Sequence, residues 1–199
     1  MRPAMCYNHS TGAFLLPNHF TVIKGSNMKI LIASDIHGSA YWCKKVLDAF
    51  KTSGAERLLL LGDLLYHGPR NDLPQGYDPK AVTGMLNGVA DKIICVRGNC
   101  DAEVDQMVLE FPIMADYAYI CIREQRIFAT HGHLFSPEQP PKLQTGDILI
   151  SGHTHITYDK TVGSFRCINP GSVSLPKEGT KHSCMICDDG EFTFVDLEK

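Results

Sequence analysis

Five times along this chain, a short apolar run leads into a segment with a glycine in it or directly beside it, and the side chains of each segment are of the kind that bind metal ions. The five segments are Asp35-Ile36-His37, Gly62-Asp63, Gly98-Asn99-Cys100-Asp101, His131-Gly132-His133 and Gly152-His153-Thr154-His155. Each apolar run has the length of a buried β-strand. Glycine lets the backbone turn sharply where the strand ends. Because ligands of α/β folds bind beyond the carboxyl ends of the strands, we expect the five segments to meet in one place.

The order of helix and strand patterns predicts an α/β fold with two sheets. Strand patterns over 29–34, 57–61 and 92–96 alternate with helical patterns over 39–51 and 79–90, which is typical of parallel βαβ units. A short helical pattern over 102–109 is followed by strand patterns over 117–122, 126–130, 147–151, 157–162, 164–168, 183–187 and 191–195. Two sheets packed face to face, with helices outside, bury these strands most simply. We expect one domain over residues 28–199.

The composition limits the partners of the chain. Charged residues are 21% of the 199 residues and the net charge is −3, so affinity for phosphate has to be local rather than carried by a basic surface. No stretch has the length of a transmembrane helix. Most of the eight cysteines lie inside apolar runs, in a chain long enough to need no disulfides. We therefore expect a cytoplasmic protein with reduced thiols, without a membrane or an extended nucleic-acid surface as partner.

Residues 1–27 differ from the rest of the chain. Their only apolar run, 13–16, is too short for the core of a signal peptide, and the strand-like pattern begins abruptly at Met28. We expect this segment to be a poorly ordered N-terminal extension. It is either an upstream addition or the product of a misread start site, with Met28 as the natural first residue.

The ligand types predict two adjacent divalent ions. Carboxylate, amide and imidazole groups without a paired thiolate site suit Mn²⁺, Fe²⁺, Zn²⁺ or Co²⁺. The assigned ligands are Asp35, His37 and His155 for the first ion, Asn99, His131 and His153 for the second, and Asp63 as the bridge. Two ions, two carboxylates and a bridging hydroxide sum to a charge of about +1, which attracts phosphate. The pattern predicts hydrolysis of a phosphate ester by in-line attack of the metal-bridging hydroxide.

These motifs, in this order, resemble the signature of the calcineurin-like metallophosphoesterase superfamily. More closely, the chain is similar to the YfcE-like phosphodiesterases of bacteria, from Met28 almost to the C-terminus. The matching runs are Ala33-Ser34-Asp35-Ile36-His37-Gly38-Ser39, Gly62-Asp63, His67-Gly68-Pro69-Arg70-Asn71, Val96-Arg97-Gly98-Asn99-Cys100-Asp101, Thr130-His131-Gly132-His133-Leu134-Phe135 and Asn169-Pro170-Gly171-Ser172. The resemblance implies a four-layer α-β-β-α sandwich of two mixed sheets with flanking helices. It also implies the same ligands, manganese as the usual ion, a small phosphodiester substrate and a homo-oligomer, either a dimer or a tetramer.

One position departs from the broad superfamily. Most members have a histidine after the Gly-Asn pair, near the leaving group, where this chain has Cys100. YfcE-like proteins share the cysteine. A neutral thiol is a poor proton donor to a leaving alkoxide, so we expect Cys100 to favour diesters with stable leaving groups. We predict catalytic roles for Cys100 and for Asp101, the latter as a partner of the metal-binding residues.

Four further residues are candidates for contact with the substrate: His67, Arg70, Asn71 and His133. The first three lie in the long loop 66–79, and Arg70 suits bidentate contact with phosphate oxygens. The alternative for this loop is that turn hydrogen bonds of its own hold it. The alternative for His133 is packing or support of its neighbour His131.

Two other functions stay open. A phosphomonoesterase or nucleotide hydrolase would use the same scaffold and site, although Cys100 argues against it. A non-catalytic interaction scaffold would resemble the retromer subunit of this fold, which has lost metal ligands. Every ligand position of this chain is filled. The sequence therefore favours a metal-dependent phosphodiesterase.

Overall fold

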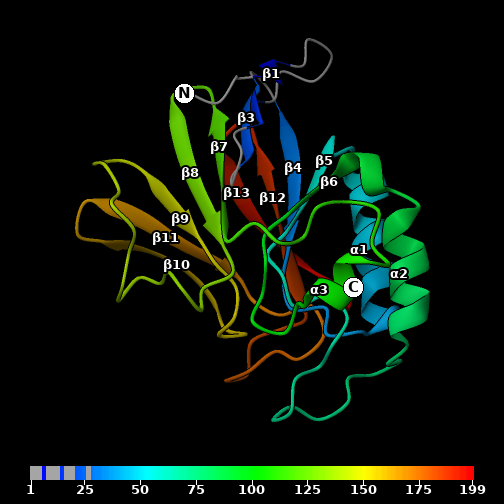
Figure 1. The fold of residues 1–199 in the computed structure, drawn as a ribbon. Coiled ribbons are helices and arrows are strands. Elements are labelled where there is room, and N and C mark those ends of the chain that lie inside the picture. The colour runs from blue at the N-terminus through cyan, green and yellow to red at the C-terminus, as the bar shows by residue number, and fades with distance from the viewer. Residues whose placement is uncertain (1–5, 8–13, 16–20, 26–27) are drawn as a thin grey trace.

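The computed structural model describes residues 6–7, 14–15, 21–25 and 28–199. In this part of the chain, two mixed sheets pack face to face, and the helices α1 (Ala40–Ser53) and α2 (Pro79–Asn87) cover the outer side of the smaller sheet (Figure 1). The expected sandwich of two mixed sheets with flanking helices is confirmed. Within the same ranges, no helix has both the length and the apolar content to cross a bilayer.

The smaller sheet has the strand order β13-β12-β4-β5-β6. Its strands are β4 (Lys29–Ala33), β5 (Arg57–Leu60), β6 (Ile93–Cys95), β12 (Ser183–Asp188) and β13 (Glu191–Asp196). The first three are parallel, as the βαβ pattern predicts, while β12 is antiparallel to β4 and β13 to β12. Helix α1 connects β4 to β5, and α2 with the short 3₁₀ helix η1 (Ala90–Lys92) connects β5 to β6. The carboxyl ends of β4, β5 and β6 therefore lie at one edge of the sheet.

Capping residues set the start and end of α1, the helix that follows the first motif. The Ser39 side chain accepts a hydrogen bond from the Trp42 backbone N–H at 3.2 Å, and the helix ends at Gly54, whose φ of 70° is left-handed. Val46 and Phe50, one turn apart, are buried against the sheet. The helix is thus fixed directly behind the turn that carries Asp35 and His37.

The larger sheet has the strand order β1-β2-β3-β7-β8-β9-β11-β10. Its strands are β1 (Cys6–Tyr7), β2 (Phe14–Leu15), β3 (Thr21–Gly25), β7 (Tyr117–Ile122), β8 (Gln125–Thr130), β9 (Ile148–Ile150), β10 (Thr157–Val162) and β11 (Phe165–Pro170). Strands β7 and β8 form an antiparallel hairpin, and β9 is parallel to both β8 and β11. The short helix α3 (Glu103–Gln106) precedes β7 in the chain and is shorter than the pattern over 102–109 indicates. The ends of β8 and β9 carry the last two motifs.

The predicted N-terminal extension, residues 1–27, is described only in part. Its strands β1, β2 and β3 add to the edge of the larger sheet, where β3 pairs with β7 in parallel. Residues 1–5, 8–13, 16–20 and 26–27 lie outside the described ranges. The expected poor order of this extension, and the domain boundary at residue 28, stay predictions.

Two apolar layers hold the sandwich together. One lies between the sheets and includes Ile32 and Ile150; the other lies between the smaller sheet and the helices and includes Val46 and Leu60. Each of these side chains is almost fully buried, so each stabilises the fold by about 1.5–3 kcal/mol relative to an exposed position. Both layers extend to the strand ends and give the motifs a rigid base.

A loop packs on the outer face of the larger sheet. Segment 131–147 connects β8 to β9, and within these described residues it contains no helix. Phe135 and Leu143 from this segment pack on buried Phe128 and Leu149 of the sheet. The segment carries three prolines among its residues, each without a backbone N–H donor, which explains why a loop rather than a helix covers this face.

Candidate functional site

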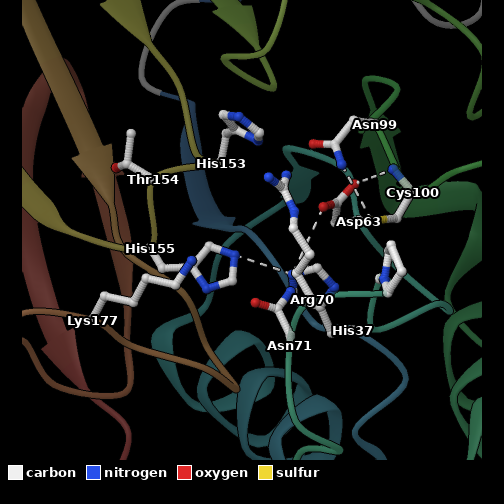
Figure 2. A pocket seen from close by; sticks show the side chains of 12 residues that line it. His37, Asp63, Arg70, Asn71, Asn99, Cys100, His153, Thr154, His155 and Lys177 are labelled. Atoms are coloured by element: carbon white, nitrogen blue, oxygen red, sulfur yellow. Dashed lines mark hydrogen bonds and ion pairs between the residues drawn. The ribbon is translucent and has the colours of Figure 1, made fainter.

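The five predicted motifs meet at one edge of the sandwich. The first three follow β4, β5 and β6 of the smaller sheet, and the last two follow β8 and β9 of the larger sheet. All seven predicted metal ligands lie in these turns, and Figure 2 shows most of their side chains around one cavity. The cavity has a volume of about 500 Å³. The segments that follow the strand ends therefore lie close together, as the sequence analysis expects.

Five predicted ligands have a left-handed backbone. The φ angles are 58° at Asp35, 51° at His37, 56° at Asp63, 66° at His153 and 63° at His155. The left-handed conformation costs a residue with a side chain roughly 1–2 kcal/mol. Such strain persists only where the surroundings impose it, and it is concentrated at functional sites. This clustering is an indication of function that does not depend on residue type.

Hydrogen bonds from distant segments hold the strained turn at Asp35. The hydroxyls of Ser172 and Ser174 both donate to the Asp35 carbonyl oxygen at 2.9 Å. The Asp35 backbone N–H donates to the carbonyl of Gly62, and the backbone N–H of His153 donates to Asp35 Oδ2 at 3.1 Å. Asp35 is thus fixed by groups from three other parts of the chain. Residues Asn169–Ser172 are one of the segments that match the YfcE-like family. The sequence alone did not predict that Ser172 supports Asp35.

Asp101 holds the turn at Asp63 from behind. Its Oδ2 accepts the backbone N–H groups of Asp63 at 2.9 Å and Gly98 at 2.7 Å, and its Oδ1 accepts that of Leu64 at 2.9 Å. Asp101 is buried and does not line the cavity. Burial raises the pKa of its carboxyl above the usual range even though these three bonds oppose the shift. The geometry gives Asp101 a role in positioning Asp63 rather than contact with a substrate.

Three of the predicted ligand histidines are oriented by backbone carbonyls. The Nδ1 atoms of His37, His131 and His155 donate to the carbonyls of Tyr66, Leu61 and Leu175, at 2.8, 2.7 and 2.6 Å respectively. A carbonyl only accepts, so Nδ1 carries a proton in each ring, and each imidazole in its neutral form presents the lone pair of Nε2 to the site. This arrangement is typical of metal-binding imidazoles.

The Nε2 atoms of the three histidines point at the two buried carboxylates. His37 Nε2 lies 3.6 Å from Asp35 Oδ1 and 3.7 Å from Asp63 Oδ2. His155 Nε2 lies 3.3 Å from Asp35 Oδ1, and His131 Nε2 lies 3.5 Å from Asp63 Oδ2. Among the described residues, two groups made only of carboxylates and imidazoles have all their ligand atoms within 4.8 Å of one another: Asp35 with His37 and His155, and Asp35 with Asp63 and His131. The residues form two adjoining sets of ligands that share a carboxylate.

The contact between two imidazoles of the site requires a cation. Nε2 of His37 and Nε2 of His155 lie 3.1 Å apart although both Nδ1 atoms already carry protons. Two lone pairs cannot face each other at this distance unless a proton or a metal ion lies between them. Asp35 Oδ1 beside them is buried and has no hydrogen-bond partner. These donors therefore fit a divalent ion.

The charges of the site are balanced by neighbouring residues. Burial alone would raise the pKa of Asp35, but the neighbouring imidazoles of His155 and His37 hold that pKa well below its usual range. Burial alone would lower the pKa of His131, but Asp63 and Asp35 raise it to about 9. Protons on the imidazoles thus offset the carboxylates when metal is absent. Binding of a divalent ion would replace these protons.

The remaining predicted ligands lie beside His131. Asn99 Oδ1 is 3.0 Å from His131 Nε2, and the ring centroids of His153 and His131 are 5.1 Å apart. Burial and the neighbouring His131 lower the pKa of His153, so its ring favours the neutral form that binds metals. The structure therefore brings together all seven residues of the predicted ligand set.

The predicted substrate residues are only partly at the cavity. Arg70 and Asn71 line it, and Figure 2 shows the Arg70 guanidinium reaching in between His153 and Asp63. The Asn71 amide donates to the His67 carbonyl at 2.7 Å, in keeping with a loop that turn hydrogen bonds hold.

His67 and His133 do not line the cavity. His67 packs edge-on against Tyr66 and Tyr77. The His133 ring lies 5.4 Å from that of His131, and burial lowers its pKa to about 4. Their predicted contact with the substrate stays a prediction, and the geometry favours support of neighbouring groups.

Two cavity residues were missed from the sequence. Thr154 and Lys177 line the cavity beside His155 (Figure 2). The backbone N–H of Lys177 donates to the His155 carbonyl at 3.1 Å, so the loop after β11 is bonded to the last motif. The only indication of Lys177 in the sequence was a lysine within a loop rich in serine, proline and glycine. Its position at the site depends on contacts between segments distant in the sequence.

Known proteins share these features. The calcineurin-like phosphoesterase superfamily domain matches residues 28–190. The chain is 50% identical over 170 residues to phosphodiesterase YfcE of Escherichia coli (strain K12), covering 85% of this chain and 92% of that protein. It is 28% identical over 151 residues to phosphodiesterase MJ0936 of Methanocaldococcus jannaschii, covering 72% of this chain and 83% of that protein.

Solved structures agree with this assignment. The structure of the E. coli phosphoesterase Yfce matches with a TM-score of 0.83 at 50% identity, over 85% of this chain and 93% of that chain. Vps29 of Entamoeba histolytica complexed with zinc has a TM-score of 0.53 at 22% identity, over 85% of this chain and 99% of that chain, and shows a common fold. With the superfamily domain matched over residues 28–190, from the first core strand nearly to the last, the chain belongs to the calcineurin-like phosphoesterase superfamily.

Proposed function

We propose that this protein is a metal-dependent phosphodiesterase that hydrolyses a small phosphodiester at a centre of two divalent ions, with Mn²⁺ as the usual metal. The observation that carries the proposal is the pair of Nε2 atoms of His37 and His155, 3.1 Å apart beside the unpartnered Asp35 Oδ1. This arrangement needs a cation, and it lies at an open cavity of a size that suits a small molecule. The relative at 50% identity is named a phosphodiesterase.

The proposed ligands divide into two sets that Asp63 joins. They are Asp35, His37 and His155 for one ion and Asn99, His131 and His153 for the other. Oxygen and nitrogen donors of this kind suit Mn²⁺, with Zn²⁺, Fe²⁺ and Co²⁺ as alternatives. When bound, such a pair of ions lowers the pKa of water and neutralises charge on phosphate oxygens during in-line attack.

The chain itself supplies two cations for the phosphate. Arg70 and Lys177 line the cavity on different segments, and both side chains are exposed. The guanidinium of Arg70 can donate two parallel hydrogen bonds to phosphate oxygens, while the ammonium of Lys177 acts as a point charge. Their role is to bind and orient a monoanionic diester in front of the buried carboxylates. Asn71 fixes the loop that presents Arg70.

Arg70→Ala and Lys177→Ala should each raise KM for a diester by about tenfold, since a hydrogen bond to a charged group contributes about 1.5 kcal/mol or more. We expect a smaller change in kcat, because both residues bind the ground state as well as the transition state. Steady-state kinetics at saturating Mn²⁺ measures both parameters. Lys80→Ala, an exposed residue on α2, is the matched control. Equal KM values in all four proteins would contradict the assignment.

The function is tested with metal-stripped protein and two chromogenic substrates. We expect hydrolysis of bis(p-nitrophenyl) phosphate to exceed that of p-nitrophenyl phosphate, and to depend on added Mn²⁺. His155→Ala should lose this activity, because it removes one of the two imidazoles that face each other. Metal-dependent cleavage of the monoester in preference to the diester would favour the phosphomonoesterase instead. Bound metal without turnover of either substrate would favour a non-catalytic scaffold.

The Cys100 side chain supports a phosphodiester rather than a phosphomonoester as the substrate. Its side chain lines the cavity beside Asp63. Burial and the Asp63 carboxylate raise the pKa of its thiol to about 12, so it is a poor proton donor at neutral pH. Cys100→His should raise the ratio of monoesterase to diesterase activity, because an imidazolium protonates a leaving alkoxide. The two chromogenic substrates measure this ratio. An unchanged ratio would contradict the hypothesis that Cys100 sets the substrate specificity.

Three further properties belong to the proposal. A cytoplasmic location is supported by seven described cysteines, all free and most of them buried. The net charge of −3 supports a small substrate, because the protein has no strongly basic surface on which to bind an extended nucleic acid. A homo-oligomer, dimer or tetramer, stays a prediction from the family resemblance.

A further inference from the structure

A third group of metal-binding atoms lies in the cavity and includes a sulfur. The Sγ of Cys100, an imidazole nitrogen of His37 and a carboxylate oxygen of Asp63 all lie within 4.8 Å of one another. Two of these residues belong to the proposed metal centre, on which this inference rests. We propose that Cys100 is an additional ligand for thiophilic divalent ions such as Zn²⁺, so that the site distinguishes them from Mn²⁺.

The surrounding contacts hold the sulfur at this place. The Cys100 backbone N–H donates to Asp63 Oδ1 at 2.8 Å, which fixes the residue beside the carboxylate. A Cβ atom added to Gly68 would come within 3.2 Å of Sγ, so the absence of a side chain at Gly68 leaves room for the thiol. The Asn99 amide donates to Sγ at 3.3 Å. Figure 2 shows the sulfur on the same side of the cavity as Asp63.

The choice of ion follows from ligand chemistry. Sulfur is a soft ligand that suits Zn²⁺, with a Zn–S distance of about 2.3 Å, whereas Mn²⁺ prefers oxygen and nitrogen. A zinc ion at this group takes the thiolate, and the thiol proton leaves to water. A thiophilic ion is therefore bound more tightly than Mn²⁺, which leaves the thiol free.

The experiment compares metal binding by the wild-type protein, Cys100→Ser and Cys121→Ser, each stripped of metal. Cys121 is the matched control, because it and Cys100 are the partly exposed cysteines among those whose side chains are described, and Cys121 lies on β7 away from the cavity. Co²⁺ reports sulfur ligation through a charge-transfer band in the near ultraviolet. Competition with a chromophoric chelator gives the affinities for Zn²⁺ and Mn²⁺. Cys100→Ala is the second variant, in case serine oxygen replaces the sulfur.

We expect the charge-transfer band in the wild type and in Cys121→Ser, and its loss in both Cys100 variants. Even outer partners of metal ligands contribute about 10–100-fold to affinity, so loss of the sulfur should weaken Zn²⁺ binding at least about tenfold. Mn²⁺ affinity should stay unchanged. Bound Co²⁺ without the band in the wild type would overturn the inference, as would equal losses of Zn²⁺ and Mn²⁺ affinity. A band in a protein that hydrolyses no diester would support sulfur ligation while refuting the proposed function.

Discussion

Asp63→Asn should lower metal-dependent diester hydrolysis by more than about 100-fold, because substitution of even the outer partners of metal ligands costs about 10–100-fold. Asp63 is the proposed bridge between the two ions, and its Oδ2 faces the Nε2 atoms of both His37 and His131. Asparagine keeps the size and the acceptor oxygen that receives the Cys100 N–H, but it removes the charge. Metal content after dialysis against Mn²⁺ should fall together with the activity.

The control for Asp63→Asn is Asp91→Asn, which removes an exposed carboxylate from η1. It should keep both activity and metal content. Thermal unfolding of the metal-free proteins separates loss of metal from loss of fold. If Asp63→Asn keeps its metal and loses only activity, the residue acts on the substrate and is not a bridge. Full activity in Asp63→Asn would refute the two-ion centre.

Much of the site could be predicted because its ligands are encoded locally. Each proposed ligand follows the end of a strand by one to five residues, so a strand pattern and a nearby glycine are enough to place it. The sequence did not predict the left-handed backbone at Asp35 or His153, because glycine is the residue that normally indicates such a conformation. Residue type predicted the ligands in spite of the conformation that they adopt.

The supporting contacts could not be predicted because they join distant segments. Ser172 and Ser174 bond to Asp35 across more than a hundred residues, and Lys177 reaches the cavity only because its loop is bonded to His155. Nothing in the local sequence around these residues specifies the partner.

Strain and support explain why these distant contacts matter. Five left-handed residues at roughly 1–2 kcal/mol each are a large fraction of the stability of a domain, about 5–15 kcal/mol. The hydrogen bonds to the turns at Asp35 and Asp63 offset that cost in the metal-free protein. Because the turns are imposed from outside, the proposed ligands are held in position in the metal-free protein. Substitution of residues that hydrogen-bond to these turns should therefore lower both the stability of the fold and the affinity for metal.

Asp101→Ala should destabilise the metal-free protein by about 3 kcal/mol or more. It leaves three backbone N–H groups without their acceptor, those of Asp63, Leu64 and Gly98, and each buried unsatisfied donor costs about 1–3 kcal/mol. In a chain of this size, 1 kcal/mol corresponds to about 2–4 °C in Tm, so we expect a fall of at least about 6 °C. Circular dichroism during heating measures it.

Two comparisons assign this loss to the turn at Asp63. Glu103→Ala removes an exposed carboxylate two residues away, at the start of α3, and should leave Tm unchanged. Asp101→Asn keeps one acceptor oxygen and should lie between Asp101→Ala and the wild type. Because the turn is no longer held, Mn²⁺ affinity should fall by about 10–100-fold in Asp101→Ala, although Asp101 does not line the cavity. Wild-type Tm together with wild-type Mn²⁺ affinity in Asp101→Ala would show that the turn holds itself, and the strain at Asp63 would then need another source of support.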